Sequence, residues 1–278
     1  MTRFCALFFC FLTLLPVIGV AAPNGRLPVR PAQQTESTTP APPTPAPLPA
    51  PASTPAEPTE GTLARWFGHA FVFLTSQSGV RIALNPFTEG TVDYKIPDNL
   101  PAEIVLISSE SSDHSGGQHI FGIPQIFRSL AGVGANRANG IPFRGINTWR
   151  DAEGGKRLGR NTVYVIEVDG LRFCHLGTLG HPLGSRDVSA IGQVDVLFLP
   201  VGTLDLSPRE ILRNAELLGA KWIVPITYKT PKNTKVDLRP LDAIDFTAFP
   251  VRKLDGSEYR FSAKTLPSQP TVLEWRDP

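Results

Sequence analysis

The loop at residues 108–117 carries side chains that could do chemistry. It directly follows an apolar run, 104–107, which is typical of a buried strand that fixes where the next side chains point. A Ser-His-Asp triad needs groups that converge from separate backbone positions, so neighbours on one short loop are not expected to form a serine hydrolase site. The loop offers hydroxyl, carboxylate and imidazole groups, which serve in metal binding and acid–base chemistry, on Ser109, Ser111, Asp113 and His114.

The segments around this loop predict an α/β sandwich, because strand patterns alternate with helical ones. Asp169-Gly170 is a strong signal for a two-residue hairpin between two apolar runs. Ser207 and Glu210 form a capping box with a proline between them, which predicts a helix that ends at Gly219. Strands are expected at 66–74, 80–84, 103–107, 123–127, 161–168, 171–175, 194–201 and 222–228.

The composition divides the chain into three parts. Residues 1–22 have the positive start, apolar core and small-residue end of a secretory signal peptide. Residues 23–60 are dominated by Pro, Ala, Thr and Ser, which cannot form a core and predict a disordered, extended linker. The folded domain is expected at 61–278. We therefore expect an exported protein, periplasmic or secreted, which is attached to a membrane only if the signal peptide stays uncleaved.

Charge and cysteine content exclude some partners and cross-links. The formal net charge is +2, which gives no reason to expect nucleic acid as a partner. Of the 3 Cys, two lie in the predicted signal peptide, so Cys174 would remain without a partner for an internal disulfide. We expect Cys174 to be a small buried apolar residue rather than a nucleophile.

Seven short segments together resemble the metallo-β-lactamase-fold hydrolases, in particular the branch similar to ascorbate-6-phosphate lactonase. They occur in the order of that family and cover nearly all of the chain after residue 62. The resemblance implies an αββα four-layer sandwich, in which two mixed sheets pack face to face and the metal site lies on loops at one edge. The segments are 66–69, 84–87, 108–114, 154–161, 175–181, 199–202 and 223–230.

The same resemblance implies a site for two metal ions from which most ligands are missing. Of the family's seven ligand positions, only Asp113 and His114 keep the expected residue. The chain has 5 His, and none of the other four lies near 109–111, 150 or 227, so no shift of the alignment supplies the missing ligands. The five changed positions hold Ser109, Ser111, Arg150, Thr178 and Thr227.

Two remaining ligands do not predict a metal centre. Zinc sites use three or four nitrogen, sulfur or carboxylate ligands, and neutral hydroxyls are poor substitutes. We therefore expect no cofactor and no catalytic residues, with Asp113 and His114 as a remnant site. If a metal such as zinc binds after all, these two residues would hold it, joined by Glu110 or Asp151, each of which lies next to a changed position.

Other charged and histidine side chains receive structural interpretations. Arg150 places a fixed cation where a metal would have been, and we hypothesise that it pairs with Asp113, the alternative being a solvated loop residue. His69, His175 and His181 match family positions that are not metal ligands, so we expect hydrogen-bonded structural roles for them.

The sequence thus favours a non-enzymatic module on a hydrolase scaffold. It would bind an unknown protein or small-molecule ligand through the former active-site cleft, or act as a structural module on its proline-rich stalk. The alternative is a phosphodiesterase-like or lactonase-like metal-dependent hydrolase with an atypical metal site.

Overall fold

The computed structural model describes residues 60–278 of the chain. The predicted signal peptide at 1–22 and the predicted linker up to residue 59 lie outside the described residues, so both stay predictions. In the described part of the chain, no helix is long and apolar enough to cross a membrane.

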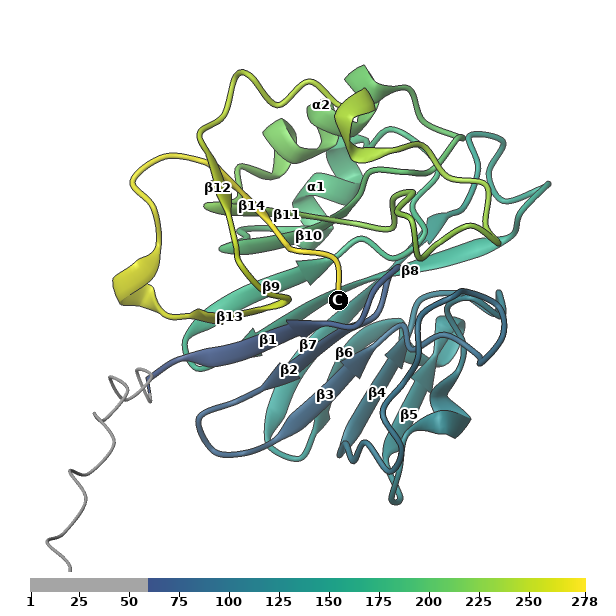
Figure 1. The fold of residues 1–278 in the computed structure, drawn as a ribbon, viewed down its shortest axis with the longest axis vertical. Coiled ribbons are helices and arrows are strands. Elements are labelled where there is room, and N and C mark those ends of the chain that lie inside the picture. The colour runs from purple at the N-terminus through teal and green to yellow at the C-terminus, as the bar shows by residue number, and fades with distance from the viewer. Residues whose placement is uncertain (1–59) are drawn as a thin grey trace, which may run out of the picture. The chain divides into compact units, whose positions relative to one another are not determined.

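Two mixed β-sheets form the centre of the domain (Figure 1). The first contains β1 (Thr62–Trp66), β2 (Val72–Thr75), β3 (Arg81–Leu84), β4 (Ile104–Ile107), β5 (Gln125–Arg128) and β13 (Glu258–Phe261), in the order β13-β1-β2-β3-β4-β5. The second contains β6 (Gly134–Ala138), β7 (Ile141–Trp149), β8 (Arg160–Val168), β9 (Leu171–His175), β10 (Val196–Pro200), β11 (Trp222–Ile226), β12 (Val251–Lys253) and β14 (Thr271–Glu274), in the order β12-β14-β11-β10-β9-β8-β7-β6.

Both α-helices contact the eight-stranded sheet. Helix α1 (Ser185–Ile191) contacts β7, and helix α2 (Pro208–Leu218) contacts β10. The capping box predicted for α2 is present, and the helix ends at Gly219 in a left-handed conformation. Short 3₁₀ helices complete the described elements: η1 (Gly117–His119), η2 (Ser129–Gly132), η3 (Leu241–Ala243) and η4 (Ala263–Thr265).

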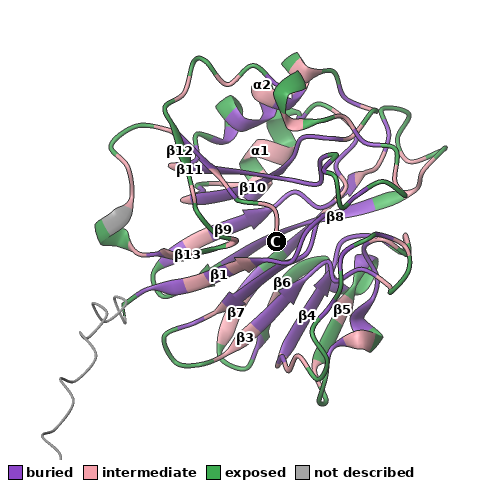
Figure 2. Ribbon diagram, in the orientation of Figure 1, coloured by how far each residue is buried: buried purple, intermediate pink, exposed green. Residues whose placement is uncertain are grey.

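Strand β4 is buried on both faces, which explains its uninterrupted apolar sequence. Ile104 and Leu106 belong to the large core cluster, which also contains strands of the other sheet and therefore lies between the two sheets. Val105 and Ile107 belong to a second cluster with residues of the irregular segment 85–102, such as Phe87. Figure 2 shows β4 as buried. A strand packed on both faces holds the loop that follows it in a fixed place.

The predicted hairpins exist, but one predicted strand is two strands. The expected strand 66–74 turns back on itself between β1 and β2, which pair antiparallel with Trp66 opposite Val72. Gly68 and His69 both have positive φ, and this reverses the chain. The apolar residues on both sides of the turn gave the appearance of one strand. The turn matters for the site because it carries His69.

A second hairpin, β6–β7, has no counterpart among the predicted strands. It turns at Asn139-Gly140, where both residues have positive φ, as a two-residue hairpin turn requires. The predicted strand 123–127 is observed as β5, which is shifted towards Arg128. Asn-Gly is a strong hairpin signal, so the β6–β7 hairpin could have been predicted from the sequence.

His175 is a structural residue, as its position in the sequence indicated. It is buried at the end of β9, where its Nδ1 accepts from the backbone N–H of Gly177 at 2.9 Å. Its Nε2 therefore carries the proton and donates to the carbonyl of Ala70 at 3.0 Å. Burial lowers the pKa of His175 from 6.5 to about 4, so the folded protein holds this imidazole neutral.

We expect acid to destabilise the fold through His175. Between its ordinary pKa of 6.5 and the folded value of about 4, protons bind the unfolded chain more tightly than the folded one. The contribution of this group is complete above pH 6.5 and is lost as the pH falls to 4, by up to about 3 kcal/mol in the free energy of unfolding. Chemical denaturation at pH 7 and pH 4.5 should show a larger loss for the wild type than for His175→Gln. Equal losses would contradict this assignment.

Candidate functional site

The loop after β4 is fixed by backbone and side-chain hydrogen bonds at its start. The side-chain oxygen of Asn85 accepts from the Ser108 N–H at 2.7 Å, and the Ser108 carbonyl accepts from Thr162 N–H at 2.8 Å. Further along the loop, the N–H of His114 donates to the carbonyl of Ser111 at 2.9 Å. These bonds tie the loop to both sheets, so Asp113 and His114 are presented at a defined place.

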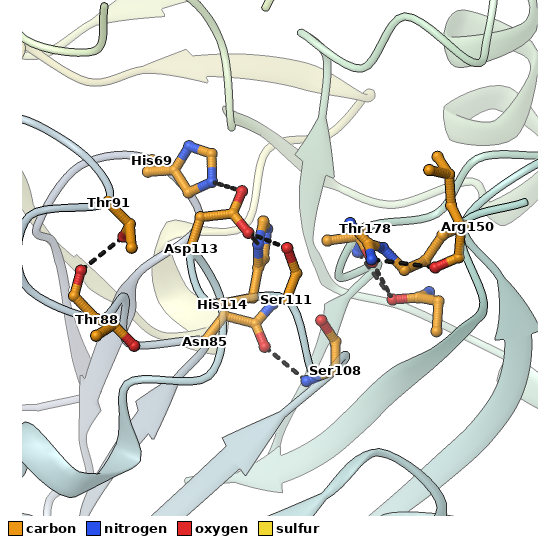
Figure 3. Close-up of polar contacts among 12 residues, drawn as sticks. His69, Asn85, Thr88, Thr91, Ser108, Ser111, Asp113, His114, Arg150 and Thr178 are labelled. Carbon is orange, nitrogen blue, oxygen red and sulfur yellow. Dashed lines mark hydrogen bonds and ion pairs between the residues drawn. The ribbon is translucent and has the colours of Figure 1, made fainter. Parts of the chain in front are cut away.

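Asp113 is the centre of a polar cluster that brings together three chain segments (Figure 3). Its Oδ2 accepts from His69 Nε2 at 3.1 Å, and its Oδ1 accepts from the Ser111 hydroxyl. His114 Nδ1 lies 3.0 Å from Oδ1, a close approach that is not aligned as a hydrogen bond. The rings of His69 and His114 meet edge to face, with their centroids 4.8 Å apart. Both oxygens of Asp113 are therefore engaged within the protein.

His69 uses both ring nitrogens in this cluster. The side-chain amide of Asn233 donates to Nδ1 at 3.1 Å, so the proton of the neutral ring is on Nε2 and points at Asp113. Burial lowers the pKa of His69, although the hydrogen bond to Asp113 opposes this effect. His69 is thus a neutral donor to a carboxylate, which agrees with the hydrogen-bonded structural role predicted for it.

Asp113 is held in its charged form. Burial by itself would raise the pKa of this carboxyl, but the neighbouring imidazoles of His114 and His69 outweigh burial and place the pKa well below its usual range. A carboxylate with engaged oxygens and a low pKa is a poor general base or acid near neutral pH.

Three of the five changed ligand positions line the same cavity as the two retained ones. A cavity of about 460 Å³ lies beside the cluster, with Asp113 and His114 among its lining residues. Ser111 reaches the cluster through its bond to Asp113. Ser109 is buried, and its hydroxyl has no hydrogen-bond partner among the described residues. The changed positions that line the cavity are Arg150, Thr178 and Thr227.

The hypothesised ion pair between Arg150 and Asp113 is wrong. Arg150 follows β7, and its Nη1 donates instead to the carbonyl of Leu158 at 3.1 Å. Figure 3 shows Arg150 beside Thr178, on the opposite side of the view from Asp113. The pair with Arg150 does not form because His69 and Ser111 already donate hydrogen bonds to the two oxygens of Asp113, and neither contact is evident from the sequence.

The two acidic residues that could have completed an atypical metal site are engaged elsewhere. Asp151 is buried, and its two oxygens accept four backbone N–H groups, from residues 153, 155, 157 and 158. The bond from Leu158 contributes most to lowering the pKa of Asp151 to about 2. Glu110 pairs with Arg128 at 2.7 Å on the surface. Asp151 therefore organises the loop that carries Arg157 and Leu158 to the cavity rather than offering a metal ligand.

The residues present do not fit the two-metal centre of the fold. Within residues 60–278, the one group of three or more candidate ligands is His69, Asp113 and His114, whose ligand atoms lie within 4.8 Å of one another. Zinc needs an imidazole nitrogen with a free lone pair, but Nδ1 of His69 accepts from Asn233 and Nε2 carries a proton for Asp113. Of the ring nitrogens of His69 and His114, only Nε2 of His114 has neither a hydrogen bond nor a close approach to Asp113.

Two members of the cluster were not expected at the site, although a hydrogen-bonded structural role was expected for His69. His69 lies in the segment 66–69 that supported the family resemblance, and its position directly after a glycine could have suggested a tight turn at a site. Asn233 gave no signal of its own, because its contact with His69 spans 164 residues of sequence. His181 lies away from this cluster and contacts the carbonyl of the next residue, Pro182, at 2.9 Å.

Comparison with known proteins places this geometry in a family. The model of the beta-lactamase superfamily domain matches residues 64–227, so the chain belongs to that superfamily, and its fold is the predicted sandwich of metallo-β-lactamase type. A UPF0173 metal-dependent hydrolase of Thermococcus onnurineus is 26% identical over 193 residues, which cover 60% of this chain and 84% of the relative. A relative of the same description from Carboxydothermus hydrogenoformans is 26% identical over 192 residues, covering 59% and 84%.

Solved structures agree with this assignment. A Thermotoga maritima protein named as a Zn-dependent hydrolase of the metallo-beta-lactamase superfamily is 31% identical and has a TM-score of 0.62, covering 77% of this chain and all of the other. A Parabacteroides distasonis protein, named as a metal-dependent hydrolase, is 19% identical with a TM-score of 0.51 over 62% of this chain and 84% of its own, which shows the shared fold alone.

Removal of the central carboxylate should destabilise the fold. In Asp113→Ala the buried N–H of His69 and the hydroxyl of Ser111 lose their acceptor, which should lower the free energy of unfolding by about 1–3 kcal/mol. Asp237→Ala is the matched control, because Asp237 is an exposed carboxylate at the same cavity and should change stability by less than about 0.5 kcal/mol. Denaturant melts of both variants measure this, and equal effects would contradict the central place of Asp113.

Proposed function

We propose that this chain is a ligand-binding member of the metallo-β-lactamase fold that has lost the metal site and the hydrolase activity. The observation that carries the proposal is the state of the seven expected ligand positions. Five of them line one cavity, and three of these five hold Arg150, Thr178 and Thr227 in place of the expected ligands. The retained Asp113 is bound by His69 and Ser111 instead of facing an open coordination position.

The loss of activity follows from the chemistry of the donor set. A metal ion activates water by lowering its pKa towards about 7, and this requires enough ligands to hold the ion against solvent. Serine and threonine hydroxyls are neutral and do not supply such ligands. The carboxylate of Asp113 is also engaged by its neighbours, so this retained residue is not free to act as a base.

The alternative, a metal-dependent hydrolase with an atypical site, has one observation in its favour. His69, Asp113 and His114 lie close enough to share an ion. Such an ion would have to displace the Asn233 amide from His69 or the His69 proton from Asp113. The relatives carry the name of metal-dependent hydrolases, which describes those proteins and not this one.

A chelator should leave this protein unchanged. Metal-dependent folds lose stability when the ion is removed, because binding free energy contributes to folding. We expect the same melting temperature with and without EDTA, and no hydrolysis of phosphodiester or lactone substrates above a buffer blank, even with added zinc or manganese. A fall of several degrees in EDTA, or metal-stimulated turnover, would support the alternative.

We further propose that the chain is exported, on the strength of the signal-like segment at 1–22. Expressed from its full coding sequence in a bacterium, the protein should appear in the periplasm or the medium. Its intact mass should correspond to cleavage at Ala21 or Ala22. Recovery of the full-length mass from the membrane fraction would show an uncleaved anchor instead.

A further inference from the structure

We propose that the ligand of the cavity is a small organic oxyanion, a carboxylate or a phosphate monoester, which binds between Arg150 and His114. This inference rests on the proposed function, because a metal centre would fill the same space. The charges that line the cavity and the polar atoms without partners support it.

Arg150 supplies a positive charge that no carboxylate balances in the described part of the chain. Two arginines line the cavity, and Arg157 is paired with Asp205. Arg150 has no such ion pair, since its Nη1 donates to the neutral carbonyl of Leu158 at 3.1 Å. Asp113, which lines the same cavity, is engaged by His69 and Ser111. Arg150 therefore contributes a positive charge to the cavity that an anionic ligand would balance.

The geometry of Arg150 leaves a binding edge. Because Nη1 is used by Leu158, the guanidinium keeps its edge of Nε and Nη2, and Nε is buried with no hydrogen-bond partner in the described residues. Two parallel N–H groups of this kind match the two oxygens of a carboxylate or phosphate. A buried, charged donor without a partner is costly, so an oxyanion at this edge would be favoured.

Two further residues that line the cavity carry buried polar atoms without partners. The hydroxyl of Thr227 and Nε2 of His114 have no hydrogen-bond partner within residues 60–278, and both residues are at least nine-tenths buried, at 5% and 2% exposed. Both residues line the cavity together with Arg150. The threonine hydroxyl can donate to an oxyanion, and an imidazole nitrogen beside an oxyanion can share a proton with it, whichever of the two carries that proton.

The volume and the other lining residues of the cavity indicate the size and polarity of the rest of the ligand. A cavity of about 460 Å³ lies within the range of small-molecule sites, roughly 300–1,000 Å³, and exceeds the size of a bare inorganic ion. Pro200, Leu204, Val236 and Leu238 give part of it an apolar lining. The other carboxylates at the cavity are Asp205, which is paired, and Asp237, which is exposed. A small molecule with one anionic end and an apolar body fits this arrangement.

Thermal unfolding with anions as probes tests this inference. Inorganic phosphate and acetate represent the two oxyanion classes, and sodium chloride at matched ionic strength controls for general salt effects. The wild type should show a saturable rise in melting temperature with at least one oxyanion. Arg150→Gln should weaken that anion's apparent affinity by roughly tenfold or more, the loss of a charge-assisted pair of bonds, and Arg150→Lys should restore part of it. Arg209→Gln, on the exposed side of α2, is the matched control and should behave as the wild type.

A second measurement does not depend on variants that fold. In the wild type, addition of the stabilising anion should shift the backbone amide resonances of Thr178 and Thr227 but not that of Gly140 in the distant β6–β7 turn. The oxyanion inference alone is overturned if neither anion changes the melting temperature of the metal-free protein. It is also overturned if the anion stabilises the Arg150→Gln variant as strongly as the wild type. Stoichiometric metal in the same wild-type sample overturns the proposed function, and this inference with it.

Discussion

The buried carboxylate of Asp113 is the constraint on which the site depends. A charge in this position requires compensation, and here the protein itself supplies it through the N–H of His69 and the hydroxyl of Ser111. In a metal centre, the ion would supply that compensation. Ser111, at a position where the family resemblance implies a metal ligand, instead donates its hydroxyl to Oδ1 of Asp113.

The scaffold keeps this arrangement rigid. Strand β4 is buried on both faces, and the loop after it is bonded to both sheets through Ser108. On the other side of the cavity, Asp151 gathers four backbone N–H groups and so orders the loop that positions Leu158 against Arg150. The scaffold therefore holds these side chains in fixed positions at one edge of the sheets, and in the proposed function they bind a ligand without hydrolysing it.

Much of the fold could be predicted from the sequence, because the central strands β4, β10 and β11 are buried apolar runs and because helix α2 carries its own start and stop signals in Ser207, Glu210 and Gly219. The positions around the site could be predicted as well, since Asp113, His114, Arg150, Thr178 and Thr227 do line one cavity. What could not be predicted was the pairing among them. The turn at His69 depends on two positive φ angles, and the contact of His69 with Asn233 joins segments 164 residues apart. The expected Arg150–Asp113 pair does not form, because Asp113 is engaged by Ser111 and by His69, which is 44 residues away in sequence.

Elemental analysis of the purified full-length protein tests the central claim most directly. The measurement should be made on protein produced in medium containing zinc, iron and manganese, beside a variant that restores the family ligands at the five changed positions, with histidine at 109, 111, 150 and 227 and aspartate at 178. We predict no stoichiometric metal in the wild type and near-stoichiometric metal in the restored variant. A wild-type protein that carries a full equivalent of any of these metals would contradict the account.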